Sequence, residues 1–256
     1  MRAAVFARGV ALAALLAHST AIAQQKHLAF VSCPIVRDTK TVPCWLAEFG
    51  GETYYLGIQT DVSADFYPPS LGHKVLVEGE PSNEPRICGG VPIKNVVVSV
   101  MPERADNCQT LLMAEDRYDL PFEPPRPPGP SKGRLAFAYP EPEKPQPPYQ
   151  PKSFELRYDF DMTVGFKHPR FLVLVLDYAR LTGARSISIV GHRGRTALSD
   201  GSALVERDRL AEIRAKEVAE LLRGAGLTAP KYDVSWVDDP EEGDASRRRV
   251  TITVNP

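Results

Sequence analysis

Two arginines stand where a helix should be apolar. The run from Ser202 to Arg223 is predicted to form a long amphipathic helix, and Arg207 and Arg214 fall within its apolar stripe. A buried unpaired charge is very costly, so such a guanidinium needs a partner. The partner is either an internal acid, such as Asp159 or Asp161, or the carboxylate of a ligand held by two parallel hydrogen bonds.

Two further residues could take part in chemistry near these arginines. His192 ends a predicted buried strand, where a lone histidine is usually structural, and no second histidine lies at metal-ligand spacing. Asp200 either forms a turn with Gly201 before the helix or offers a carboxylate to a ligand. The stretch 191–194 lacks the signature of a phosphate loop. No motif marks an acid and base pair, so we expect no enzymatic activity, no cofactor and no metal site.

Three motifs follow one another in the last hundred residues. Gly191-His192 closes a strand, Leu210-Ala-Glu-Ile-Arg-Ala215 lies on the predicted helix, and Arg248-Arg-Val-Thr-Ile-Thr-Val254 forms a final strand. In order and spacing they resemble the Gly-His/Tyr-Thr-Asp, Leu-Ser-x-Arg-Arg-Ala and Arg-Arg-Val-x-Ile-x-Val motifs of the OmpA-like peptidoglycan-binding domain family. The resemblance covers about residues 153–255.

The resemblance implies non-covalent binding of the diaminopimelate residue of peptidoglycan stem peptides. The end of that side chain is a zwitterion, for which the family uses an aspartate and an arginine. Arg214 aligns with the arginine, but Arg193-Gly194 replaces Thr-Asp, and Arg207 stands where the family usually has asparagine. Asp200, 14 positions before Arg214, is the candidate for the displaced acid. The expected peptidoglycan-binding residues are Arg214, Asp200, Arg207 and His192.

The elements that would position these residues form a compact α/β unit. Alternating apolar residues predict strands at 153–160, 232–237 and 249–254, and a continuous apolar run predicts a buried strand at 186–190. A helix is predicted from Pro169 to Leu181, in addition to the long one. The order βαβαββ predicts a two-layer sandwich over residues 153–256.

The preceding region, residues 24–118, is predicted to be a small all-β domain with disulfides. Five short strand signals, two of them flanking the hairpin signal Gly50-Gly51, fit an OB-like barrel whose ligand the sequence does not indicate. All four cysteines lie here, behind a signal peptide, which favours disulfides over zinc. The shortest loops pair Cys33 with Cys44 and Cys88 with Cys108.

The remaining segments concern export and spacing. Residues 1–23 read as a signal peptide cleaved before Gln24, and no later run is long and apolar enough for a membrane helix. Residues 119–152 are rich in proline and predict a semi-rigid linker, which the apolar alternation of residues 133–139 interrupts. A net charge of −1 with interspersed signs argues against nucleic acid as a partner.

These features lead to two hypotheses. The first is a non-catalytic periplasmic tether, associated with the cell wall or outer membrane, that binds peptidoglycan through its C-terminal domain and an envelope protein through its N-terminal domain. The alternative is an envelope scaffold whose OmpA-like domain no longer binds peptidoglycan and contacts protein instead. The missing family aspartate keeps this alternative open.

Overall fold

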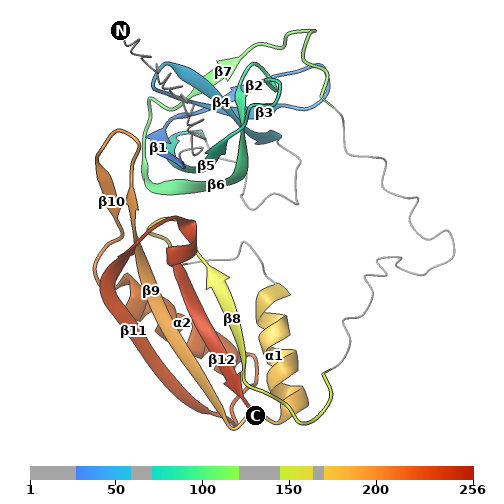
Figure 1. Cartoon of the computed structure of the whole chain (residues 1–256), viewed down its shortest axis with the longest axis vertical. Coiled ribbons are helices and arrows are strands. Elements are labelled where there is room, and N and C mark those ends of the chain that lie inside the picture. The colour runs from blue at the N-terminus through green and yellow to red at the C-terminus, as the bar shows by residue number, and fades with distance from the viewer. Residues whose placement is uncertain (1–26, 59–70, 121–144, 164–169) are drawn as a thin grey trace, which may run out of the picture.

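The computed structural model describes residues 27–58, 71–120, 145–163 and 170–256. The predicted signal peptide, most of the proline-rich linker and the apolar stretch at 133–139 lie outside these residues. The described chain forms a β domain and an α/β domain that lie against each other (Figure 1). None of its described helices has the length and apolar character needed to cross a membrane.

The β domain contains seven strands, five of which confirm the predicted signals. They are β1 (Leu28–Ser32), β2 (Pro34–Arg37), β3 (Cys44–Phe49), β4 (Glu52–Ile58), β5 (His73–Pro81), β6 (Val91–Arg104) and β7 (Thr110–Leu112). Gly50 and Gly51 join β3 to β4 with φ values of 60° and 79°, which suit glycine and explain the tight hairpin.

The strands close into a barrel. β1 and β2 form one strand interrupted at Cys33, pairing with β5 through β1 and with β3 through β2. β3 pairs with β4, β4 runs parallel to β6, and β6 returns to β5. This closed order of five strands is that of an OB-type Greek-key barrel, as predicted. Its core consists of buried apolar side chains: Phe30, Trp45, Ala47, Leu56, Val75, Val77, Ile93 and Val98.

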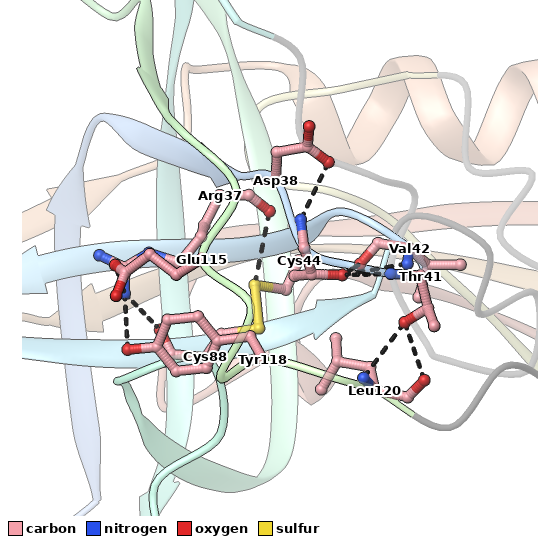
Figure 2. The surroundings of a disulfide bond; sticks show 10 residues. Arg37, Asp38, Thr41, Val42, Cys44, Cys88, Glu115, Tyr118 and Leu120 are labelled. Atoms are coloured by element: carbon pink, nitrogen blue, oxygen red, sulfur yellow. Dashed lines mark hydrogen bonds and ion pairs between the residues drawn. A yellow bond between two sulfur atoms is a disulfide. The ribbon is translucent and has the colours of Figure 1, made fainter.

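All four cysteines form disulfides, but the predicted pairing is wrong. Cys33 is bonded to Cys108 across 75 residues of sequence. Cys44 is bonded to Cys88 across 44 residues (Figure 2). The barrel explains the Cys33–Cys108 bond, because β5 pairs with both β1 and β6. Cys33 directly follows β1 and Cys108 follows β6, so the two cysteines meet at the same end of the sheet. Closure of the barrel, rather than proximity in the sequence, decides which cysteines meet. Long closed loops also constrain the unfolded chain more than short ones.

The C-terminal domain confirms the predicted βαβαββ order and adds one short strand and a 3₁₀ turn. Its elements are β8 (Lys152–Arg157), α1 (Arg170–Thr182), β9 (Ser186–Ala197), β10 (Ala203–Val205), α2 (Leu210–Gly224), β11 (Lys231–Glu242), the 3₁₀ helix η1 (Ala245–Arg247) and β12 (Arg249–Asn255).

The sheet of this domain has helices on one face. Its strand order is β8-β12-β9-β11, with β11 parallel to β9, and β10 pairs with the far end of β9. Helix α1 contacts β8 and β12, and α2 contacts β9 and β11. Fully buried residues such as Val250 and Ile252 of β12 face the helices. Each such side chain contributes roughly 1.5–3 kcal/mol through burial.

The long helix begins eight residues later than predicted, at Leu210 rather than Ser202. Strand β9 continues beyond its predicted end to Ala197, and residues 203–205 fold back on it as β10. The two strands form the β9–β10 hairpin, with Asp200-Gly201 at its turn. Gly201 has a φ of 90°, and Asp-Gly between apolar runs is a hairpin signal. Arg207 therefore lies before the helix and not on its apolar stripe.

The β9–β10 hairpin reaches the barrel (Figure 1). The Ser199 amide donates to the carbonyl oxygen of Ala29 at 2.7 Å, and the Ala29 amide donates to Ser199 Oγ at 3.0 Å. These bonds satisfy backbone groups of β1, a strand whose second edge has no other strand partner in the described chain. The two domains are thus in direct contact despite the linker between them.

Candidate functional site

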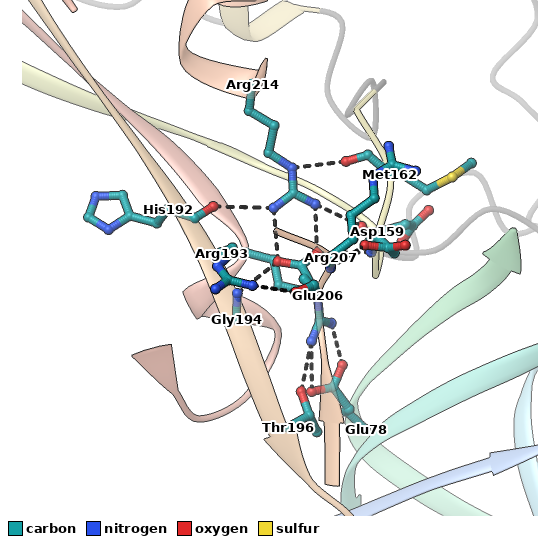
Figure 3. A network of polar contacts seen from close by, with 12 residues as sticks. Glu78, Asp159, Met162, His192, Arg193, Gly194, Thr196, Glu206, Arg207 and Arg214 are labelled. Atoms are coloured by element: carbon teal, nitrogen blue, oxygen red, sulfur yellow. Dashed lines mark hydrogen bonds and ion pairs between the residues drawn. The ribbon is translucent and has the colours of Figure 1, made fainter. Parts of the chain in front are cut away.

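Arg214 lies on α2 and points into the centre of the domain (Figure 3). Its side chain is fully buried, at 0% exposure. Nε donates to the carbonyl oxygen of Met162 at 2.9 Å, and the two terminal nitrogens reach the carbonyl oxygens of His192 and Asp159 at 3.2 and 3.3 Å. The guanidinium also lies 4.4 Å from the ring centre of Tyr158, a distance at which a cation is attracted to the ring face.

The charge of Arg214 is neutralised by Glu206. The two carboxylate oxygens accept from the two terminal nitrogens of Arg214 at 3.0 and 2.6 Å. The same oxygens accept from the backbone amides of Gly194 at 2.7 Å and Asp161 at 2.9 Å. A buried ion pair is tolerated when both partners are saturated with hydrogen bonds in this way.

Of the two explanations for a buried arginine, the structure shows the internal salt bridge, but with a different acid. Asp159 contributes its backbone carbonyl to Arg214, and the Asp161 carboxylate accepts from the Arg207 amide at 2.8 Å. The sequence does not single out Glu206 as this acid, because the predicted helix includes Glu206 as an ordinary helical residue next to Arg207. The hairpin instead turns Glu206 inward, where it is 1% exposed.

Asp200 and Arg207, both predicted to assist Arg214, lie elsewhere. Asp200 is exposed at the tip of the β9–β10 hairpin, where it accepts from the amide and hydroxyl of Ser202 at 2.9 and 2.6 Å. These bonds, the hydroxyl first, lower the pKa of Asp200. The strand from His192, which contacts Arg214, to Ala197 spans about 16 Å. Asp200 lies beyond Ala197 and is therefore far from Arg214. Asp200 is therefore not the acid that completes a site at Arg214. Arg207 is exposed.

His192 is brought to Arg214 by its backbone only. Its carbonyl oxygen accepts from Arg214, while its ring points away (Figure 3). His192 Nδ1 lies 2.7 Å from Glu241 Oε1, and Arg249 donates to the other oxygen of Glu241 at 2.9 Å. Burial raises the pKa of Glu241, but the hydrogen bonds from Arg249 and His192 outweigh it, and the net pKa is lowered. These contacts support the structural role for His192.

The glycine of the Gly191-His192 motif also has a packing reason. A Cβ at Gly191 would lie 2.0 Å from the carbonyl oxygen of Ala211, so only glycine lets α2 approach β9 this closely. Arg193 replaces the threonine of the family motif. It is buried, donating to the carbonyl oxygen of Glu206 at 2.7 Å and pairing with Asp208 at 2.9 Å. Arg193 therefore helps to hold Glu206 in place.

A second buried ion pair joins the two domains. Arg248 of the α/β domain is fully buried and pairs with Glu78 of β5, itself 1% exposed (Figure 3). Arg248 also donates to Thr196 Oγ1 at 3.1 Å, at the base of the β9–β10 hairpin. A cavity of about 510 Å³ beside Glu78 is lined by both domains. The arginine that the family resemblance assigns to the closing strand thus binds the barrel.

The described residues contain no group of three or more histidine, cysteine, aspartate or glutamate side chains arranged to hold a metal ion. Both fully buried carboxylates in this region, Glu78 and Glu206, are paired with arginine. Two disulfides are typical of a protein that matures in an oxidising compartment.

The fold and site together define a two-domain protein, an OB-type barrel docked on a two-layer α/β domain with an internally neutralised arginine. No model of a known protein family matches the chain, and no curated protein matches it. Among solved structures, a MotB-like protein from Desulfovibrio vulgaris is similar, with 16% identity over 41% of this chain and 75% of that chain and a TM-score of 0.33. A likeness at this level establishes neither the ligand nor the site of this chain.

Proposed function

We propose that this protein is a non-catalytic scaffold of the bacterial cell envelope. Its α/β domain serves to hold and present the barrel to a protein partner, and does not bind peptidoglycan stem peptides through Arg214. The observation that carries this proposal is the Glu206 carboxylate, which occupies both terminal nitrogens of Arg214 inside the domain.

A ligand carboxylate could reach Arg214 only by displacing Glu206. Glu206 is held by four hydrogen bonds, two of them from backbone amides that would lose their acceptor. Displacement would also leave a carboxylate unpaired in the interior, which costs several kcal/mol. Asp200, the acid that the sequence suggested for the ammonium end of a zwitterion, lies at the hairpin tip instead.

The peptidoglycan tether is the second candidate. One observation favours it: α2 places Arg214 beside the backbone of His192, the position at which the family resemblance locates the wall ligand. Wall binding would then require that Glu206 leave the site when the stem peptide enters.

Co-sedimentation of the full chain with diaminopimelate-type sacculi separates the two. The scaffold proposal expects no pelleting above that of an unrelated protein, and no clearing of wall material in a zymogram. Saturable pelleting that Arg214→Lys abolishes, with an unchanged melting temperature, would overturn the proposal in favour of the tether. Lysine is the matched variant because an ammonium keeps the charge but not the planar two-pronged contact.

A further inference from the structure

The barrel carries a segment of its own chain on its outer side. This segment, Thr110–Leu120, is called the strap; it follows Cys108 and lies over β2 and the loop after it (Figure 2). Its first part is β7, which pairs in parallel with β2 from Ile35↔Thr110 to Arg37↔Leu112. The remainder is irregular.

Two side chains near its end anchor the strap. The Tyr118 hydroxyl accepts from the Arg37 guanidinium at 2.8 Å, and the backbone carbonyl of Tyr118 accepts from the Lys40 amide at 3.1 Å. Leu120 is buried, and its amide and carbonyl both bond to Thr41 Oγ1, at 3.1 and 2.8 Å. Leu120 belongs to a cluster with Ile35, Val42, Leu46 and the Cys44–Cys88 disulfide.

Leu112, at the end of β7, packs partly against the same cluster, and its carbonyl oxygen accepts from the Asp38 amide at 3.0 Å. The other residues before Tyr118 are held weakly. Leu111 is 66% exposed and Met113 86% exposed, so neither packs on the barrel. The strap acids Glu115 and Asp119 lie 3.4 and 3.3 Å from basic side chains of the barrel, but all of these carboxylates are at least 40% exposed. Segments with few buried apolar contacts open locally at a small fraction of the global unfolding free energy. Cys108 fixes one end of the strap, whereas non-covalent contacts hold Leu120.

We propose that the strap is an internal substitute for a partner, and that the surface beneath it binds an extended acidic peptide of another envelope protein. This inference rests on the scaffold function and names the kind of partner. The edge of β2 pairs with the peptide backbone, as β7 does now. Arg37 and Lys40 receive its carboxylates and an aromatic hydroxyl. The apolar floor receives an aliphatic side chain two residues further on, in the place of Leu120.

The chemistry of the floor decides between a peptide and a sugar chain. OB-type barrels bind polymers on the face of their second and third strands, which here are β3 and β4. Beneath the strap this face presents Leu46, Tyr55 and the Cys44–Cys88 disulfide, which cluster with Ile35 of the neighbouring β2. An oligosaccharide needs polar groups to bond its hydroxyls, whereas this floor suits an aliphatic side chain.

Hydrogen exchange on the full wild-type chain tests whether the strap opens. We expect amides of residues 110–120 to exchange at least about 100-fold faster than those of β5, since they need only local opening. Exchange of the strap at the rate of β5 would overturn the proposal, because the strap would then be a fixed part of the barrel.

A synthetic peptide of residues 110–120, which includes the β7 residues that pair with β2, is labelled with a fluorophore and tests the surface itself. The full-length double variant Tyr118→Ala/Leu120→Ala should bind it at least about tenfold more tightly than the wild type, a difference of about 1.4 kcal/mol. Met113→Ala is the matched control, because Met113 makes no buried contact, and it should behave as the wild type. A peptide with alanine at both anchor positions should not bind.

Absence of peptide binding to the double variant, when its strap exchanges freely and its β5 remains protected, would overturn the proposal. So would binding of glycan chains from purified wall in place of the peptide. The sacculus experiment above scores the α/β domain independently. Saturable pelleting that depends on Arg214 would overturn the scaffold function. The result of the peptide experiment on the barrel would still be interpretable in that case.

Discussion

Glu206→Ala tests the central structural claim, that Arg214 is neutralised from within. The substitution leaves a guanidinium fully buried without its counter-charge, for which breaking a buried pair costs about 3–5 kcal/mol. It also removes the acceptor of the Gly194 and Asp161 amides, each worth about 1–3 kcal/mol if left unsatisfied. Water can enter the space left by the side chain and satisfy these amides in part. We therefore expect destabilisation of the α/β domain by about 3–5 kcal/mol rather than the full sum.

The two tryptophans allow this to be measured domain by domain. Trp45 is buried in the barrel and Trp236 lies on β11. In a Trp45→Phe background, fluorescence during urea unfolding reports the α/β domain alone. Glu220→Ala on α2 is the control, because Glu220 is 75% exposed and pairs with Arg223 at the surface, and its unfolding midpoint should not change measurably.

Two further variants identify the cause of the loss. Glu206→Leu/Arg214→Met replaces both charges by apolar groups and should recover the part of the stability that is lost to the unpaired charge, while the Gly194 and Asp161 amides still lack their acceptor. Added formate should raise the unfolding midpoint of Glu206→Ala and leave that of the wild type unchanged, because a small carboxylate can enter the vacated position. A loss below about 1 kcal/mol for Glu206→Ala would refute the reasoning, since that is the range of an exposed pair.

Three other expectations follow from the structure. Non-reducing peptide mapping should find Cys33 linked to Cys108 and Cys44 to Cys88; the local pairs would contradict the barrel closure. Glu78→Gln should loosen the contact between the domains and increase the radius of gyration in small-angle scattering, whereas Glu80→Gln on the same strand should not. Glu241 has a pKa lowered below its ordinary 4.5, so its contribution to stability is present above that value and is lost as pH falls through the folded pKa. Glu241→Gln should therefore flatten the dependence of the melting temperature on pH in the acidic range, and an unchanged slope would contradict the assigned pair.

Local patterns predicted most of the fold. Period-two alternation placed β8 and β12, and the Gly50-Gly51 signal placed the β3–β4 hairpin. These features depend on neighbouring residues, which a single sequence displays. The disulfide pairing could not be obtained this way, because it depends on barrel closure between strands far apart in the chain.

The prediction of the residues around Arg214 was wrong at one turn of the chain. The sequence allows Asp200-Gly201 to form a turn directly before the helix. In the structure the two residues form the turn of a hairpin, which directs residues 203–205 back along β9. The hairpin therefore places Glu206 next to Arg214 and places Asp200 at the hairpin tip, away from Arg214. The apolar stripe of the helix correctly indicated that Arg214 is buried, and the cost of burying a charge correctly required a partner. The identity of that partner depended on the path of the chain before the helix.

Under the two proposals, each candidate ligand site is occupied by the protein's own chain. Glu206 occupies the site at Arg214 and the strap covers the surface of the barrel, but the two are held with different strength. Glu206 is 1% exposed and accepts from the Gly194 amide of β9, the Asp161 amide and the buried Arg214, so its departure requires disruption of the domain core. The strap has exposed residues over most of its length and two anchors, at Tyr118 and Leu120. Opening of the strap therefore breaks fewer buried contacts than departure of Glu206 does. The Glu78–Arg248 pair joins that barrel to the α/β domain, and under the scaffold proposal the α/β domain would present the binding surface of the barrel to the partner.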